Sequence, residues 1–150
     1  MNATFRIEER SAQPALTKRM RVPASDLPAF FAETYGSIMQ RLGELGQHPA
    51  GPPFAMYHNM DMEDLDVEAG FPLSKAPEDH GELKSSQLPG GRFYTATHVG
   101  PYDQLPRTWS ALSKHVEAQG LETDSYAFEI YTNDPMSVAP RRSRPKSAYL

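Results

Sequence analysis

Phe128-Glu-Ile-Tyr-Thr-Asn133 repeats the pattern of Phe54-Ala-Met-Tyr-His-Asn59, with phenylalanine, tyrosine and asparagine at the same spacing. Gly46 precedes the first segment at the same distance as Gly120 precedes the second. Because glycine commonly ends a helix, both segments are predicted to be strands that follow a helix. The repeated pattern indicates that the chain is built from two related halves.

A second match upstream supports the duplication. Pro23-Ala-Ser-Asp-Leu-Pro28 and Pro101-Tyr-Asp-Gln-Leu-Pro106 share both prolines and the leucine, at positions where a helix begins. The offset between the halves falls from 78 residues here to 74 at the strands, so we expect the second helix to be about one turn shorter.

Each half therefore predicts a strand–helix–strand–strand unit, over about 3–73 and 81–150. The expected fold class is α+β: duplicated β-α-β-β units form a pseudo-two-fold antiparallel sheet, with two main helices on one face and a cleft between them. The first helix is expected to have its N-cap at Ser25 and to end at Gly46, and the second to span about 104–119. Strands are expected over 5–9, 16–22 after an interruption at Pro14, 54–58, 65–71, from 83, 93–99 and 127–131.

Composition excludes several functional classes. The 150 residues suit a single domain, and the net charge of −4 disfavours a nucleic-acid binder, which needs a basic surface. With no cysteine, the chain has no disulfide, thiol nucleophile or iron–sulfur cluster. No secretory signal or membrane-length apolar run occurs, so a cytoplasmic location is expected.

Metal and cofactor sites are not expected. The five histidines lack ligand spacing, and the acidic run over 61–68 has Leu65 where a calcium loop needs a ligand. That run is interpreted as a solvated strand face. No glycine-rich phosphate loop is present, and no cofactor is predicted.

Glu129 is the position at which the two halves differ most in chemistry. It takes the place of Ala55 and lies between Phe128 and Ile130 in an otherwise apolar strand, on the same face as Tyr131. A carboxylate in apolar surroundings is costly unless a partner satisfies it. Either Glu129 is a structural carboxylate bonded to backbone or tyrosine hydroxyls, or it is the anionic floor of a ligand site.

Several motifs together resemble the GyrI-like small-molecule-binding family, the effector-binding domain of AraC-type and multidrug-responsive transcription regulators. They are Gly51-Pro-Pro-Phe-Ala-Met-Tyr57, Asp64-Leu-Asp-Val-Glu-Ala-Gly-Phe-Pro72, Leu88-Pro-Gly-Gly91, His98-Val-Gly-Pro-Tyr102 and Glu129-Ile-Tyr-Thr-Asn-Asp-Pro135. The resemblance covers nearly the whole chain and implies an aromatic cleft around a central glutamate, here Glu129.

Five aromatic residues are candidates for the walls of that cleft. Trp109, the only tryptophan, lies on the apolar stripe of the second helix and is interpreted either as core or as ligand wall. Tyr131 shares a strand face with Glu129 and is expected to bond that carboxylate or to face the ligand. The remaining candidates are Tyr57, Tyr35 on the first helix and Tyr102.

The resemblance implies three functional alternatives. The leading one is a binding protein for lipophilic, cationic small molecules, acting as sensor or sequestering agent. The second is a hydrolase that opens cyclopropane-type electrophilic natural products with Glu129 as catalytic general base. The third is a protein–protein module that inhibits a topoisomerase. Unlike regulators of the family, the chain is expected to carry no DNA-binding module and no direct nucleic-acid contact.

Overall fold

The computed structural model of the chain describes residues 3–59, 61–98, 105–120, 127–131 and 146–149. Of residues 3–6, 94, 97, 98, 105 and 146–149 only the backbone is described. The strands and helices, in chain order, are β1 Ala3–Arg10, β2 Gln13–Val22, α1 Leu27–Glu44, β3 Phe54–Tyr57, β4 Leu65–Pro72, β5 Lys84–Leu88, β6 Gly91–His98, α2 Leu105–Ala118, β7 Ala127–Ile130 and β8 Lys146–Tyr149.

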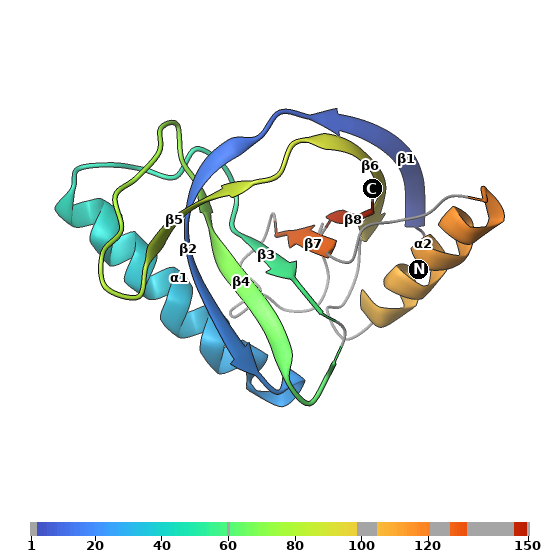
Figure 1. Cartoon of the computed structure of the whole chain (residues 1–150), viewed down its shortest axis with the longest axis horizontal. Coiled ribbons are helices and arrows are strands. Elements are labelled where there is room, and N and C mark those ends of the chain that lie inside the picture. The colour runs from blue at the N-terminus through green and yellow to red at the C-terminus, as the bar shows by residue number, and fades with distance from the viewer. Residues whose placement is uncertain (1–2, 60, 99–104, 121–126, 132–145, 150) are drawn as a thin grey trace.

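A long antiparallel ribbon connects the two halves. Residues 3–10 of β1 pair with 91–98 of β6, and residues 13–17 of β2 pair with 84–88 of β5 in the same register. The two strand pairs therefore form one continuous ribbon with a bend in its middle. Figure 1 shows this ribbon arching around β3 and β7.

All strand pairing among the described residues is antiparallel and divides into two sheets, with the orders β5-β2-β4-β3-β7 and β1-β6-β8. α1 packs on β2 and β4 of the first half, and α2 packs on β1 and β6 (Figure 1). The predicted α+β class, with duplicated units and a helix for each half, is confirmed.

The register of β3 against β7 locates the pseudo-two-fold axis. Phe54 pairs with Ile130, and Met56 pairs with Phe128. Exchange of the two halves converts the first of these pairs into the second, because Phe54 corresponds to Phe128 and Met56 to Ile130. The pair between them, Ala55 and Glu129, is converted into itself. The axis therefore passes through this pair.

The two faces of the β3–β7 pair have different partners. One face contributes to an apolar core beneath the ribbon, where the rings of Phe93 and Phe128 meet edge to face at 5.1 Å. The other face, which carries Ala55 and Tyr131, packs against Phe31 of α1. Alternation along a strand thus separates a purely apolar core from the face that carries Glu129.

Two predicted element boundaries are wrong. Ser25 lies in a 3-10 turn, Ala24–Asp26, and the N-cap of α1 is Asp26. Pro14 does not interrupt a strand: it pairs with Gln87 within the ribbon, and the break falls at residues 11–12. Pro is tolerated there because the register with β4 begins only at Ala15, so Pro14, near the start of β2, is in register with β5 alone.

The predicted ends of both helices are close to those observed. α1 ends at Glu44 and α2 at Ala118, each shortly before a glycine with positive φ, 64° at Gly46 and 68° at Gly120. This left-handed conformation favours glycine and ends a helix. The matched glycines therefore have the role that the repeat predicted for them.

The interpretation of the acidic run as a solvated strand face is wrong for two of its members. Asp66 and Glu68 are 8% and 7% exposed. They lie on β4, which is paired on both edges and buried along its whole length. Alternation of acidic and apolar residues predicts a face in water only when nothing covers the polar face, and here β2 and β5 supply polar partners for it.

Candidate ligand-binding site

Glu129 lies on the pseudo-two-fold axis. It is 5% exposed and projects from β7 on the face that packs against the helices. Tyr57 at the end of β3 and Tyr131 directly after β7 correspond to each other in the repeat, and each follows the axial pair by two residues. The duplication therefore brings one tyrosine from each half to the same carboxylate.

Among the described residues, three neutral donors contact that carboxylate. Trp109 Nε1 on α2 donates to Oε2 of Glu129, and the Tyr131 hydroxyl donates to Oε1. The Tyr57 hydroxyl also donates to Oε1, over 3.4 Å. Both oxygens of Glu129 are thus contacted by side-chain donors.

The tyrosines remain donors over the whole physiological pH range. Burial raises the pKa of Tyr57 and of Tyr131 well above the usual value of a phenol, and the negative charge of Glu129 raises both further. Both hydroxyls therefore stay protonated and can donate to Glu129. The site presents one carboxylate within aromatic side chains.

Aromatic rings continue from this centre along α1. The ring of Phe31 lies 6.0 Å from that of Tyr131 and stacks on Tyr35 at 5.7 Å. The Tyr35 hydroxyl donates to the backbone carbonyl of Phe54 at 2.8 Å, so its polar end is used in holding α1 to β3. Tyr35 is thus linked to Tyr131 through the ring of Phe31, which lies close to both.

The structure brings together four of the six residues predicted for the site: Glu129, Trp109, Tyr57 and Tyr131. Of the two alternatives for Tyr131, the hydrogen bond to Glu129 is the one found. Tyr102 lies outside the described residues. Sequence reasoning missed Phe31, although the repeat contained the signal, because Phe31 corresponds to Trp109 when the two helix starts are superimposed.

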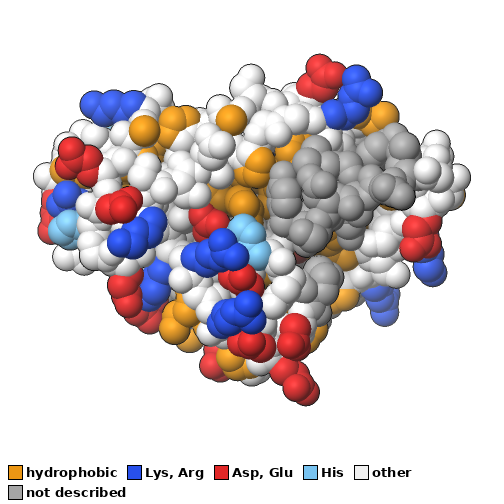
Figure 2. All heavy atoms as spheres, viewed as in Figure 1, with side chains coloured by type: hydrophobic (Ala, Val, Ile, Leu, Met, Phe, Trp, Pro, Cys, Tyr) orange, Lys and Arg blue, Asp and Glu red, His pale blue; other side chains and the backbone are white. Residues whose placement is uncertain are grey.

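A second polar cluster, also not predicted, lies on the other side of the first sheet. Glu68 accepts hydrogen bonds from Thr17 at 2.7 Å and Ser86 at 2.6 Å, and its other oxygen lies 2.9 Å from His58 Nε2. Figure 2 shows acidic and basic side chains interleaved on the face that it presents.

Burial raises the pKa of Glu68, but the hydrogen bonds from His58, Ser86 and Thr17 outweigh burial and lower the pKa to about 2. Beside it, Arg19 binds Asp66 with two hydrogen bonds of 2.8 and 2.7 Å. Both buried carboxylates of this cluster are thus matched by donors, as a structural network requires.

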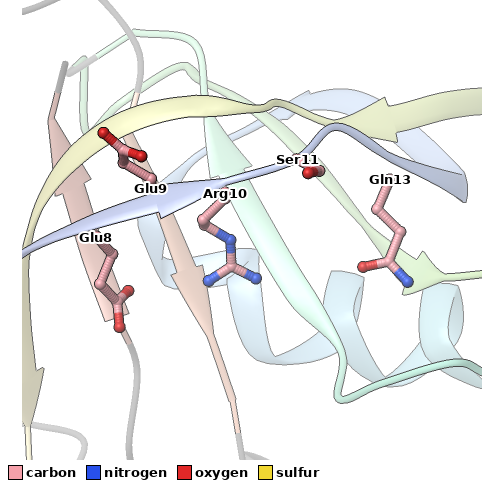
Figure 3. A pocket seen from close by; sticks show the side chains of 5 residues that line it. All are labelled: Glu8, Glu9, Arg10, Ser11 and Gln13. Atoms are coloured by element: carbon pink, nitrogen blue, oxygen red, sulfur yellow. The ribbon is translucent and has the colours of Figure 1, made fainter.

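A shallow hollow of about 500 Å³ lies at the bend of the ribbon. Figure 3 shows the five side chains that line it, and none of the predicted site residues is among them. Among the described residues, no group of three or more His, Asp or Glu could hold a metal ion. Neither described helix is long and apolar enough to cross a membrane.

Comparison with family models gives a match over residues 3–144 to the GyrI-like small molecule binding domain. The chain belongs to this family. The matched span includes the described elements from β1 to β7 and all six predicted site residues. No curated protein matches the chain.

Solved structures show the same GyrI-like fold. The C-terminal domain of EcmrR is 19% identical, covers 99% of this chain and 97% of its own, and superimposes with a TM-score of 0.82. The EcmrR chain in its complex with DNA gives a TM-score of 0.84 at 19% identity and 98% coverage, and this chain spans 56% of its length. A hydrolase from Listeria innocua is 12% identical, with a TM-score of 0.64 and coverage of 97% and 90%.

Proposed function

We propose that this GyrI-like domain binds lipophilic cations, with Glu129 as the counter-ion and the aromatic side chains around it as the wall of a cleft between the helices. The observation that carries the proposal is the set of neutral donors on Glu129. These donors carry no formal charge, so Trp109, Tyr131 and Tyr57 orient the carboxylate without neutralising its charge. A bound cation would neutralise that charge.

The surroundings of Glu129 strengthen its attraction for a cation. The carboxylate is almost fully buried, where a charge interaction is weakened less than in water. Aromatic faces add about 0.5–2 kcal/mol for each good contact with a cation. Trp109 and Tyr57 are both partly exposed, which supports an approach of the ligand from their side.

The hydrolase alternative makes a different demand on the same carboxylate. A general base needs a lone pair directed at the attacking water. Here Trp109, Tyr131 and Tyr57 already direct hydrogens at the two oxygens of Glu129. This arrangement favours binding over hydrolysis, although a hydrolase shares the fold. Formation of a ring-opened product from a cyclopropane electrophile, lost in Glu129→Gln, would reverse that preference.

The test is calorimetric titration with benzyltrimethylammonium and with its neutral isostere, neopentylbenzene. Glu129→Gln should weaken binding of the cation about tenfold or more, because an ion pair about 4 Å apart is worth about 4 kcal/mol at an effective dielectric constant near 20, more than the roughly 1.4 kcal/mol of a tenfold change. Binding of the neutral isostere should change little. Emission of Trp109, the only tryptophan, provides a second readout of occupancy.

Glu117→Gln is the matched control, because it removes one negative charge from an exposed position of α2. It should leave both affinities unchanged. Equal affinity of the wild type and Glu129→Gln for the cation would show that Glu129 is not the counter-ion.

A further inference from the structure

The hollow at the bend of the ribbon is lined by one short stretch of chain. Its lining residues are Glu8, Glu9 and Arg10 at the end of β1, Ser11 in the bend, and Gln13 at the start of β2. Figure 3 shows the side chains of Glu8, Arg10 and Gln13 pointing to the same side of this strand, with Arg10 between the other two. A volume of about 500 Å³ is large enough for a small organic molecule.

Among the described residues, Arg10 contacts an aromatic ring rather than a carboxylate. Its Cζ atom lies 5.9 Å from the centre of the Phe128 ring, a distance at which a cation is attracted to an aromatic face. No acceptor within the described part of the chain takes a hydrogen bond from the guanidinium. The Arg10 side chain is also half-buried, so its N–H groups are partly withdrawn from water. These N–H groups can therefore bind an acceptor in the hollow.

Two neutral side chains with donors lie beside Arg10. The hydroxyl of Ser11 and the side-chain amide of Gln13 line the same hollow. Neither makes a side-chain hydrogen bond to another described residue. Arg10 thus differs from an isolated surface arginine, because hydroxyl and amide donors can contact the same bound acceptor.

The two glutamates of the lining limit the charge of a ligand. Glu9 is exposed and its carboxylate accepts a hydrogen bond from Arg92 at 3.1 Å, so that charge is matched on the neighbouring strand. Glu8 points to the same side as Arg10. Its carboxylate disfavours a ligand with more than one negative charge, because like charges at short distance repel each other.

We propose that this hollow is a second binding site, which holds the carboxylate of a small monoanionic acid on Arg10. The two oxygens of a carboxylate match two parallel N–H groups of a guanidinium. Ser11 and Gln13 donate further hydrogen bonds to the same group. The five lining residues are distinct from those that contact Glu129, so the site goes beyond the proposed function and is tested separately from it.

The test is a titration of the ¹⁵N-labelled full chain with three compounds of similar shape, followed by the backbone amide signals of residues 8–13. Benzoate, the monoanion, should shift these signals saturably, with a dissociation constant in the millimolar range. Benzamide, its neutral isostere, should bind about fivefold more weakly or less, since a charge-assisted hydrogen bond is about twice as strong as a neutral one. Isophthalate, which adds a second carboxylate, should bind no more tightly than benzoate.

Arg10→Gln should weaken binding of benzoate about fivefold or more, because it removes the charge and the paired N–H groups. Lys114→Gln is the matched control, since it removes one positive charge from an exposed position of α2, and it should leave the affinity unchanged. Gln13→Glu keeps the size of the side chain and replaces an amide donor with a negative charge. It should also weaken binding of benzoate, and it replaces Arg10→Gln if that variant does not fold.

The outcomes separate this site from the cleft around Glu129. Equal affinity of the wild type for benzoate and benzamide overturns the proposal, as does unchanged binding of benzoate by folded Arg10→Gln or, in its place, Gln13→Glu. Glu129→Gln should bind benzoate as the wild type does. Loss of benzoate binding in Glu129→Gln would mean that benzoate enters the other cleft, and the proposal for the hollow would be wrong. Binding of cations by Glu129→Gln bears only on the proposed function.

Discussion

The hydroxyls of Tyr57 and Tyr131 lie 3.4 Å apart beside Glu129. The two residues are equivalent in the repeat, yet they bind the carboxylate differently. Tyr131 makes a close hydrogen bond to Oε1, whereas Tyr57 reaches the same oxygen over 3.4 Å. One half therefore holds the carboxylate firmly, and the other contributes a weak contact that a ligand can displace.

This difference predicts unequal effects of two otherwise identical substitutions. Tyr131→Phe should lower the free energy of unfolding by about 1–3 kcal/mol, because it leaves a buried carboxylate with one donor fewer. Tyr57→Phe should cost less than about 1 kcal/mol, since long hydrogen bonds are weak. Urea denaturation of both variants at neutral pH measures the two losses. A larger loss for Tyr57→Phe would show that the Tyr57 hydroxyl contributes more to stability than the Tyr131 hydroxyl.

The Arg19–Asp66 pair is predicted to contribute measurably to stability. Its two hydrogen bonds and the buried position of Asp66 favour a coupling of about 1 kcal/mol, reduced by the exposure of Arg19. A double-mutant cycle with Arg19→Ala and Asp66→Ala, measured by urea denaturation, gives this energy. The neighbouring pair Arg21–Asp64 is exposed on both sides and serves as control, with a coupling near zero. Equal couplings would mean that burial of Asp66 contributes nothing.

The fold, and the contacts at the centre of the candidate site, could largely be predicted from the sequence, for a physical reason. Repeated proline and glycine positions mark where helices begin and end, so the two halves can be aligned without knowledge of their packing. In that alignment Glu129 replaces Ala55 in an apolar strand, and this exception marks the site. Tyr131 follows by alternation, because residues two apart on a strand share a face.

The rest depends on packing between elements that are distant in sequence. The hydrogen bond from Trp109 to Glu129 requires α2 to be placed so that the indole of Trp109 reaches the side chain on β7. The burial of Glu68 could not be predicted because its partners, Thr17 and Ser86, lie on strands whose pairing with β4 and β2 the sequence does not specify. Alternation identifies the faces of a strand but not which of them is covered.

The bend of the ribbon predicts contrasting effects of two glycine substitutions. A Cβ at Gly90 would lie 2.4 Å from the backbone nitrogen of Ala12, so Gly90→Ala requires the ribbon to move and should destabilise the protein by several kcal/mol. A Cβ at Gly36, inside α1, would meet nothing within 4 Å, and Gly36→Ala should stabilise by about 0.5–1 kcal/mol. The midpoints of thermal unfolding of both variants test this contrast. Similar midpoints for Gly90→Ala and the wild type would mean that Gly90 does not approach the backbone of Ala12 closely.

Glu68 should make the stability of the protein depend on pH in the acid range. Its pKa is about 2 in the folded protein, below the ordinary value of 4.5. A depressed pKa stabilises the fold above about pH 4.5, and this contribution is lost as the pH falls toward 2. From the difference in pKa the upper limit of the contribution is roughly 3 kcal/mol.

Glu68→Gln removes this titration. The variant should be less stable than the wild type near neutral pH, and the difference between them should shrink steadily as the pH falls from about 5 to about 2. Urea denaturation at several pH values measures the difference, with Glu63→Gln, an exposed substitution, as control. A difference that stays constant over this range would mean that His58, Ser86 and Thr17 do not hold Glu68 in its ionised form.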